Sequence, residues 1–267
     1  MGESKPHIYS YTQLSTCAEC AFCYYLTRIE KVDSASNAFS ESGTLIHDIL
    51  DQWAKGLIKK EDMVKEYERR YSEEVVTKFP RMLAAKGYAE KAYNLGLRYF
   101  EEFDEFAGYK ILASEERFMI DIQMPDGTTR PFTGVIDLIL QDELTEEIII
   151  CDHKSKSLSS FKKEEDKMYR QQLMYAAYVK EAYGEWPSRL MFNLFKENGQ
   201  KPERRFDKEQ YDKTMGWACS IIEKIENNDM LDWLECKNQD FFCENICSAR
   251  KSCPNGIAKP YTKKTKT

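Results

Sequence analysis

Apolar residues recur along the first part of the chain at every third or fourth position, which is the spacing of a helix that buries one face. The clearest case is the segment 42–56, which closes at Gly56, a residue typical of helix ends. Its apolar stripe consists of Ile46, Ile49, Leu50 and Trp53. We expect residues 10–107 to be mainly helical, with an interruption near Pro80, because proline cannot continue a helix.

Beyond residue 108 the pattern changes to the alternation and the Ile-rich and Val-rich runs that are typical of β-strands. Three such segments follow one another, and Asp126-Gly127 predicts a hairpin turn after the first. These segments are residues 110–123, 131–141 and 146–155. The next elements are a crossover helix, a strand and a last long helix: residues 164–184, 188–196 and 207–227. This order predicts an α/β core around a mixed central sheet flanked by helices.

Length and composition indicate a globular chain, since 42% of its 267 residues are apolar and 31% are charged. We expect one domain over residues 1–267: a helical part (10–107), a sheet with its crossover helix (108–206), and a helix with a cysteine-rich tail (207–267) that closes back on the N-terminus. No stretch approaches the ~20 apolar residues of a membrane span, and the first residues lack the apolar core of a secretion signal. We therefore expect a cytoplasmic protein. The net charge of −6 gives no overall basic surface, which argues against a histone-like nucleic-acid binder.

Two acidic residues and a lysine interrupt the apolar strands: Asp137 in one strand, and Asp152 and Lys154 in the next. A buried carboxylate is costly unless a cation, hydrogen bonds or a metal compensates it. Residues two apart share one face of a strand, so Asp152 and Lys154 point the same way. Cys151 and His153 face the opposite layer. Two explanations fit: a divalent cation between the carboxylates, or an Asp152–Lys154 ion pair with Asp137 capping a turn.

Nine cysteines are many for a chain without an export signal, where metal ligation is favoured over disulfides. They gather near the two ends, apart from Cys151 and Cys219, which we expect to pack as small apolar side chains. The others are Cys17, Cys20, Cys23, Cys236, Cys243, Cys247 and Cys253. The last three are spaced C-x3-C-x5-C, and three thiolates need a fourth ligand to complete a zinc site or an iron–sulfur cluster. Spacing alone does not distinguish zinc from a cluster, and cysteines without any metal are a third alternative.

Five short motifs, taken in chain order, resemble the PD-(D/E)XK nuclease superfamily. They cover most of the chain and are closest to the RecB-like branch, which includes phage-encoded and CRISPR-adaptation exonucleases. They are T-x-L with a later cysteine (Thr12, Leu14 and Cys20), G-x-x-x-H (Gly43 and His47), G-x-x-D (Gly134 and Asp137), D-x-K (Asp152 and Lys154) and Q-x-x-x-Y (Gln171 and Tyr175). The neighbouring Gln172 leaves the register of the last motif open by one residue.

The resemblance implies a restriction-endonuclease-like core with a helical N-terminal insertion, and a site for Mg²⁺ or Mn²⁺. The implied metal ligands are His47, Asp137, Asp152 and the backbone carbonyl of His153. Lys154 would hold the nucleophile or stabilise the transition state, Gln171 would orient Lys154 or a nucleotide, and Tyr175 would pack against or contact the DNA strand. Glu115 resembles a position that is often acidic in relatives, and we interpret it as structural.

Several RecB-like relatives bind a [4Fe–4S] cluster through one N-terminal and three C-terminal cysteines. The resemblance therefore implies a cluster, with Zn²⁺ as the alternative, on Cys20, Cys243, Cys247 and Cys253. This sequence departs from the pattern of those relatives in two ways, which leave the set of ligands open. The first C-terminal gap has three residues rather than the commoner two, and Cys17, Cys23 or Cys236 are plausible substitutes for a ligand.

The resulting functional hypothesis is a metal-dependent DNA exonuclease that acts on single-stranded or frayed DNA ends in phage or bacterial recombination, repair or DNA processing. Its partners would be DNA and proteins of those pathways, with no membrane. Two alternatives remain: a DNA-end-binding module that is stabilised by a cluster and does not cleave, and an endonuclease, on DNA or RNA, with the same site. Cleavage polarity and oligomeric state do not follow from the sequence.

Overall fold

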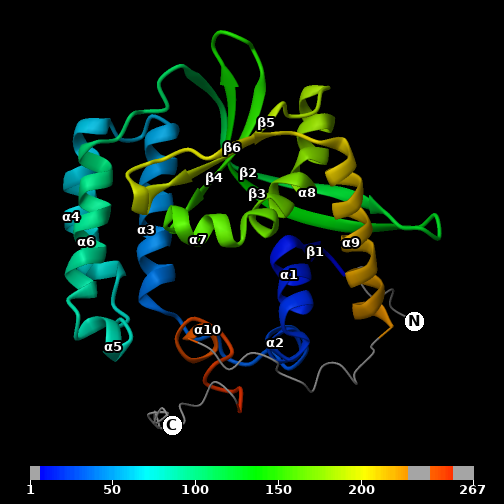
Figure 1. Ribbon diagram of the computed structural model, residues 1–267, viewed down its shortest axis with the longest axis horizontal. Helices are drawn as coiled ribbons and strands as arrows, with labels where there is room; N and C mark the ends of the chain where they lie inside the picture. The colour runs from blue at the N-terminus through cyan, green and yellow to red at the C-terminus, as the bar shows by residue number, and fades with distance from the viewer. Residues whose placement is uncertain (1–6, 228–240, 255–267) are drawn as a thin grey trace, which may run out of the picture.

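The computed structural model describes residues 7–227 and 241–254, so Cys236 lies outside the described residues. A six-stranded mixed sheet forms the centre, and helices cover both of its faces (Figure 1). The predicted α/β core around a mixed central sheet is therefore confirmed. No helix among the described residues is long and apolar enough to cross a lipid bilayer.

The sheet is organised around its longest central strand, β3. The strands are β1 (Tyr9–Ser10), β2 (Tyr109–Gln123), β3 (Thr129–Asp142), β4 (Ile148–Lys154), β5 (Arg189–Leu194) and β6 (Glu203–Arg205). One edge of β3 pairs antiparallel with β2 from Thr129 to Asp142, except at Asp137. The other edge is shared: β1 pairs with it in parallel at Tyr9↔Phe132, and β4 pairs antiparallel from Leu138↔Cys151 onward. β5 is parallel to β4, and β6 is antiparallel to β5. The sequence pattern missed β1 and β6 because strands of two and three residues leave no alternation to detect.

The helices agree with the predicted segments except at some boundaries and for two short helices, over residues 158–163 and 241–245, that the pattern did not predict. They are α1 (Tyr11–Glu19), α2 (Ala21–Tyr24), α3 (Ala38–Ala54), α4 (Lys60–Glu74), α5 (Arg81–Ala84), α6 (Tyr88–Glu101), α7 (Leu158–Lys163), α8 (Glu165–Tyr183), α9 (Lys208–Glu226) and α10 (Phe241–Asn245), with a π-helical turn over Tyr25–Ile29. The expected interruption is present, since Pro80 stands directly before α5.

The start of α3 is about one turn earlier than the pattern predicted. Asn37 is the N-cap, and its side-chain oxygen accepts a hydrogen bond of 3.0 Å from the backbone N–H of Ser40. This cap precedes the first apolar stripe, so periodicity alone placed the start at residue 42. As a result, Gly43 lies inside the helix rather than at its beginning.

Each face of the sheet carries its own apolar core. On one face the sheet packs against α1, α8 and α9, and on the other against α3, α4 and α6. β4 contributes to both cores: Ile148 and Ile150 lie in the first, and Ile149 and Cys151 in the second. This explains the continuous apolar run in β4, and it brings Asp152 to the end of a strand that is buried on both sides.

The residues around α10 contact the N-terminal part of the chain, and Figure 1 shows α10 beside α2 and the lower end of α3. The backbone N–H of Ala35 donates to the carbonyl of Ser248 at 2.8 Å, and the Asn37 amide donates to the carbonyl of Ile246 at 3.3 Å. The Arg250 guanidinium donates to the carbonyl of Ala35 at 2.9 Å. The two ends are thus joined by a few hydrogen bonds and by a small apolar cluster of Leu26, Cys247, Ala249 and Cys253.

Candidate metal centre and cysteine cavity

β3 and β4 separate at the point where both carry an acidic residue. Their pairing ends at Leu138↔Cys151, and the next residues in register, Asp137 and Asp152, are not paired. Instead, the backbone N–H of His153 donates to Oδ2 of Asp137 at 2.7 Å. The Asp137 carboxylate therefore occupies the place of a strand-to-strand hydrogen bond, which fixes its position.

Glu115 lies at an irregular point of the ladder on the other side of β3. β2 pairs Ser114 with Leu138 and Glu116 with Ile136, but the residues between them are not paired. Glu115 itself has φ of +49°, in the left-handed region that a residue with a side chain seldom adopts. Such a conformation costs on the order of 1–3 kcal/mol and is found mostly at functional sites. The surrounding sheet holds Glu115 in this conformation.

These irregularities bring together three residues from three elements: His47 on α3, Glu115 on β2 and Asp137 on β3. One donor atom from each lies within 4.8 Å of the others, and Nδ1 of His47 is 3.5 Å from Oδ2 of Asp137. The sequence interpretation treated Glu115 as structural. A strand pattern with regular alternation could not place its carboxylate here, because β2 contains a register shift between Ile111 and Ala113.

Asp152 and Lys154 form the other half of the site. Nζ of Lys154 is 2.6 Å from Oδ2 of Asp152, an oxygen that is buried and makes no hydrogen bond of good geometry. Nζ of Lys154 also donates to Oε1 of Gln171 at 3.4 Å, and Nε2 of Gln171 donates to the Tyr175 hydroxyl at 3.1 Å. Burial alone would lower the pKa of Lys154, but the neighbouring carboxylates outweigh burial and raise it. Lys154 is therefore protonated, and its ammonium is fixed in position by Asp152 and Gln171.

Two neighbouring side chains point elsewhere. Nε2 of Gln172 donates to the carbonyl of Met191 at 2.5 Å, so Gln171, and not Gln172, faces Lys154. The imidazole of His153 is buried on the α3 side of the sheet, where its ring lies 5.4 Å from that of His47 and its Nδ1 lies 2.9 Å from the amide nitrogen of Asn193. Burial holds the pKa of His153 well below its usual value, so this ring is neutral. Only the backbone of His153 faces the acidic residues.

The pKa values of the three possible metal ligands are all shifted towards the neutral form when no cation is present. Burial, and then the charge of Asp152, raises the pKa of Asp137 to about 8. Burial also raises the pKa of Glu115, with the charge of Asp137 as the next cause. Burial lowers the pKa of His47. A divalent cation compensates for this, because its charge favours deprotonated carboxylates and neutral imidazole. Two carboxylates and an imidazole are suitable donors for Mg²⁺ or Mn²⁺.

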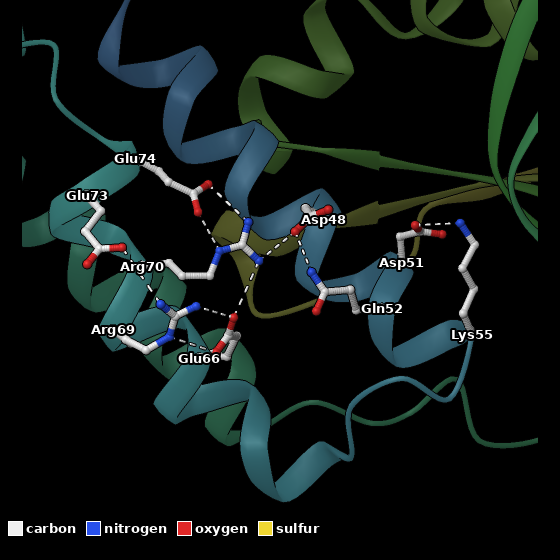
Figure 2. Close-up of polar contacts among 9 residues, drawn as sticks. All are labelled: Asp48, Asp51, Gln52, Lys55, Glu66, Arg69, Arg70, Glu73 and Glu74. Carbon is white, nitrogen blue, oxygen red and sulfur yellow. Dashed lines mark hydrogen bonds and ion pairs between the residues drawn. The ribbon is translucent and has the colours of Figure 1, made fainter.

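The helix that carries His47 is fixed by ion pairs on its outer side (Figure 2). The guanidinium of Arg70 on α4 lies 2.6 Å from Asp48 of α3 and 2.5 Å from Glu74 of its own helix. The Arg70 side chain is 12% exposed, whereas Asp48 is 43% and Glu74 38% exposed, so the guanidinium is shielded from solvent and its carboxylate partners are not. It couples the residue next to His47 to the neighbouring helix.

A second contact joins α3 to β2 beside the metal centre. Oγ of Ser114 donates to Oδ1 of Asp51 at 2.6 Å, and Nζ of Lys55 lies 2.8 Å from the other oxygen of Asp51 (Figure 2 shows the pair of Asp51 with Lys55). Ser114 directly precedes Glu115 in the irregular part of β2. The contact therefore links the element that carries His47 to the element that carries Glu115.

Five cysteines from the two ends of the chain line one cavity of about 180 Å³. They are Cys20, Cys23, Cys243, Cys247 and Cys253. Sγ of Cys23 is 3.5 Å from Sγ of Cys247, and this hydrogen bond lowers the pKa of the Cys247 thiol. Cys17 is separate, since it is buried against Ala21 and Tyr24. The cavity thus contains the four cysteines that the resemblance implied, together with Cys23.

A family model described as the PD-(D/E)XK nuclease superfamily matches residues 8–254 of the chain. Among solved structures, the chain is similar to one titled "Crystal structure of SSO0001", with 16% sequence identity and a TM-score of 0.34. That match covers 75% of this chain and 87% of the other. No curated protein matches the chain.

Proposed function

The chain belongs to the PD-(D/E)XK nuclease superfamily, and from this we propose that it is a DNA exonuclease whose divalent cation is held by His47, Glu115 and Asp137. The observation that carries the proposal is the convergence of these three donors from α3, β2 and β3 within 4.8 Å. Asp152 is the proposed fourth side-chain ligand, because its carboxylate is buried at the point where β3 and β4 separate and its negative charge raises the pKa of Asp137. The backbone carbonyl of His153 is a further proposed ligand.

In this site, a bound Mg²⁺ or Mn²⁺ supplies the Lewis acid that neutralises the phosphate and lowers the pKa of a water molecule. Asp152 keeps Lys154 charged and in place at 2.6 Å. The Lys154 ammonium can then orient the attacking water or stabilise the charge that develops on the phosphate. Gln171 restrains Lys154 from the side of α8, and Tyr175 restrains Gln171 in turn. Oxygen donors favour Mg²⁺, and the imidazole makes Mn²⁺ a good alternative.

The cysteine cavity supports a second part of the proposal, a [4Fe–4S] cluster, with Zn²⁺ as the alternative. Its ligands would be Cys20, Cys243, Cys247 and Cys253, all of which line the cavity, and Cys23 is the alternative to Cys20. Thiolates are the preferred ligands of both groups. Such a site would join two segments that are more than two hundred residues apart in the sequence, and this would restrict the unfolded chain strongly.

For the biological setting we propose a cytoplasmic enzyme that processes single-stranded or frayed DNA ends in phage or bacterial recombination and repair, together with protein partners of those pathways. Two different classes of function compete with this proposal. A DNA-end-binding module would use the same surface without cleavage, and an endonuclease would cut away from ends.

One experiment separates the three functions. End-labelled linear and circular single-stranded DNA are incubated with Mg²⁺, with Mn²⁺ and with EDTA, using the wild type and Asp152→Ala. An exonuclease degrades the linear strand only, and only with a cation, and Asp152→Ala abolishes this. Cleavage of the circle identifies an endonuclease. Binding without cleavage in every condition contradicts the proposed activity.

A further inference from the structure

Gly43 is a glycine that the fold itself does not require. It lies inside α3, one turn before His47, where glycine lowers helix stability relative to alanine. A Cβ at this position would meet no atom of the protein within 4 Å, so close packing does not explain the residue. Its bare backbone instead faces the groove in front of the metal centre. The absence of a side chain keeps room in that groove for something outside the chain.

The groove connects the metal centre to an aromatic surface. It has a volume of about 430 Å³, and its lining includes His47, Glu115 and Lys154 at one end and Phe39 at the other. Phe39 also lines the adjoining pocket together with Tyr88 and Lys196. Phe39 and His47 are eight residues apart on α3, which is about 12 Å along the helix axis at its usual rise. A few nucleotides of a strand can span this distance.

The far end of the groove combines aromatic rings with a cation. Phe39 is partly exposed, and its ring lies 5.7 Å from Tyr88 and 6.4 Å from Phe241, which is 41% exposed. Nζ of Lys196 lies 5.6 Å from the centre of the Phe39 ring and 3.2 Å from the Tyr88 hydroxyl. Among residues 7–227 and 241–254, no carboxylate forms an ion pair with Lys196. Its charge therefore remains available to a phosphate.

We propose that Phe39, Gly43 and Lys196 form a subsite for the nucleotides that flank the scissile phosphate of a single DNA strand. A base stacks on Phe39, the sugar–phosphate backbone passes over the bare face of Gly43, and Lys196 pairs with a phosphate. Aromatic platforms beside lysines are a common way to bind single strands, because every base has a stacking face. A base on Phe39 has left the stack of a duplex, so the subsite selects single-stranded DNA. This inference rests on the proposed nuclease function and identifies residues that bind its single-stranded substrate beside the metal centre.

The chain offers a matched control for the central residue. Gly216 lies in the middle of α9 and is exposed, and a Cβ at this position would likewise meet no atom within 4 Å. Gly43→Leu and Gly216→Leu should therefore both keep or raise the melting temperature, since leucine is the better helix former. We expect Gly43→Leu to weaken binding of a single-stranded 12-nucleotide probe by about tenfold or more, and Gly216→Leu to leave it unchanged. Binding is measured by fluorescence anisotropy in Ca²⁺.

Two further variants test the stacking and the charge separately. A 2-aminopurine base in the probe should lose fluorescence on binding to the wild type, and Phe39→Leu should abolish that quenching. Lys196→Gln should reduce the salt dependence of binding by about one phosphate contact. Unchanged quenching in Phe39→Leu together with unchanged affinity in Gly43→Leu would overturn the subsite.

Hydrolysis of bis(p-nitrophenyl) phosphate separates the subsite from the proposed function, because this small diester reaches the metal centre only. We expect Gly43→Leu to lose at least about tenfold more kcat/KM on the oligonucleotide than on the small diester. An equal loss on both substrates would show that Gly43 shapes the metal centre, and would overturn the subsite. If the wild type cleaves neither substrate, the proposed function fails, and the binding comparison alone decides the subsite.

Discussion

The metal centre and the cysteine cavity are both sets of ligands gathered from distant parts of the chain, but they are held in different ways. His47, Glu115 and Asp137 project from a long helix and two long strands that pack in the cores of the sheet. The cysteine cavity is built from short elements at the two ends, which meet through a small apolar cluster around Leu26 and Ala249 and through a few hydrogen bonds. The metal centre is therefore preorganised by the fold, whereas the cysteine cavity depends more on whatever its thiols bind.

This difference leads to opposite expectations for the loss of a ligand. At the metal centre, removal of a carboxyl removes a polar group that is costly to bury without a cation, so we expect the fold to survive and the chemistry to be lost. At the cysteine cavity, removal of a thiol would take away a ligand of the proposed cluster or zinc, which would join the two ends, so we expect the fold itself to be weakened.

The largest effect is expected for Asp137→Asn. Cleavage of end-labelled single-stranded DNA in Mg²⁺ should fall by about 10³-fold, because the amide cannot provide the charge that the cation needs. The melting temperature in EDTA should stay the same or rise. The control is Asp121→Asn, an exposed position on the same sheet. If Asp137→Asn cleaves DNA as fast as the wild type, Asp137 is not a ligand of the catalytic cation.

The second prediction concerns pH and the proton on Asp137. Its pKa is raised from an ordinary 3.8 to about 8, so the folded protein without metal keeps a proton that the unfolded chain has lost. The free energy of unfolding in EDTA should therefore fall as pH rises from about 4 to about 8, by at most ~1.4 kcal/mol per pH unit. Over the upper part of that window, the apparent affinity for Mn²⁺ should rise by up to about tenfold per unit, since the cation displaces this proton.

Calorimetric titration with Mn²⁺ between pH 5 and pH 9 measures the pH dependence of the affinity. Thermal melts in EDTA over the same range measure the pH dependence of the stability. In Asp137→Asn, the melting temperature in EDTA should depend less on pH, because the amide does not titrate. An affinity for Mn²⁺ that is independent of pH in the wild type would contradict the proton competition.

Glu115→Gln gives the third effect and tests whether this residue is a ligand. We expect the affinity for Mn²⁺ to fall by about 10–100-fold, with little change in the melting temperature. Glu116→Gln is the neighbouring control, since Glu116 accepts a hydrogen bond from Tyr178 instead. If both variants bind Mn²⁺ as tightly as the wild type, Glu115 is structural, as the sequence analysis interpreted it.

The two regions also differ in how far the sequence predicted them. The sequence predicted the acidic pair of Asp137 and Asp152, because each residue interrupts an apolar run. The periodicity of apolar residues alone predicted the α/β core. Glu115 was missed because its direction depends on a register shift and a left-handed residue, which no alternating pattern reveals. The position of Cys23 beside Cys247 depends on how the chain ends meet, and this is a matter of long-range packing.

The fourth prediction concerns the cysteine cavity and uses Cys247→Ser. Purified without oxygen, the variant should lose the iron or zinc of the wild type. Its melting temperature should fall by about 5–10 °C, as expected for the loss of a link across a long loop. Cys219→Ser is the control, because Cys219 is buried outside the cavity, where its thiol donates to the carbonyl of Gln123. Wild-type protein that contains neither metal would refute the ligand role of these cysteines.

The smallest effect tests how strongly the fold preorganises the metal centre. Ser114→Ala removes the hydrogen bond of 2.6 Å to Asp51, the link between α3 and β2 beside Glu115. Strand pairing and the core still fix both elements, so we expect the affinity for Mn²⁺ to fall by less than about tenfold. Ser220→Ala, which removes an exposed hydroxyl on α9, should have no effect. A loss as large as that of Glu115→Gln would mean that one hydrogen bond, rather than the sheet, holds Glu115 in its left-handed conformation, and the contrast with the cysteine cavity would then disappear.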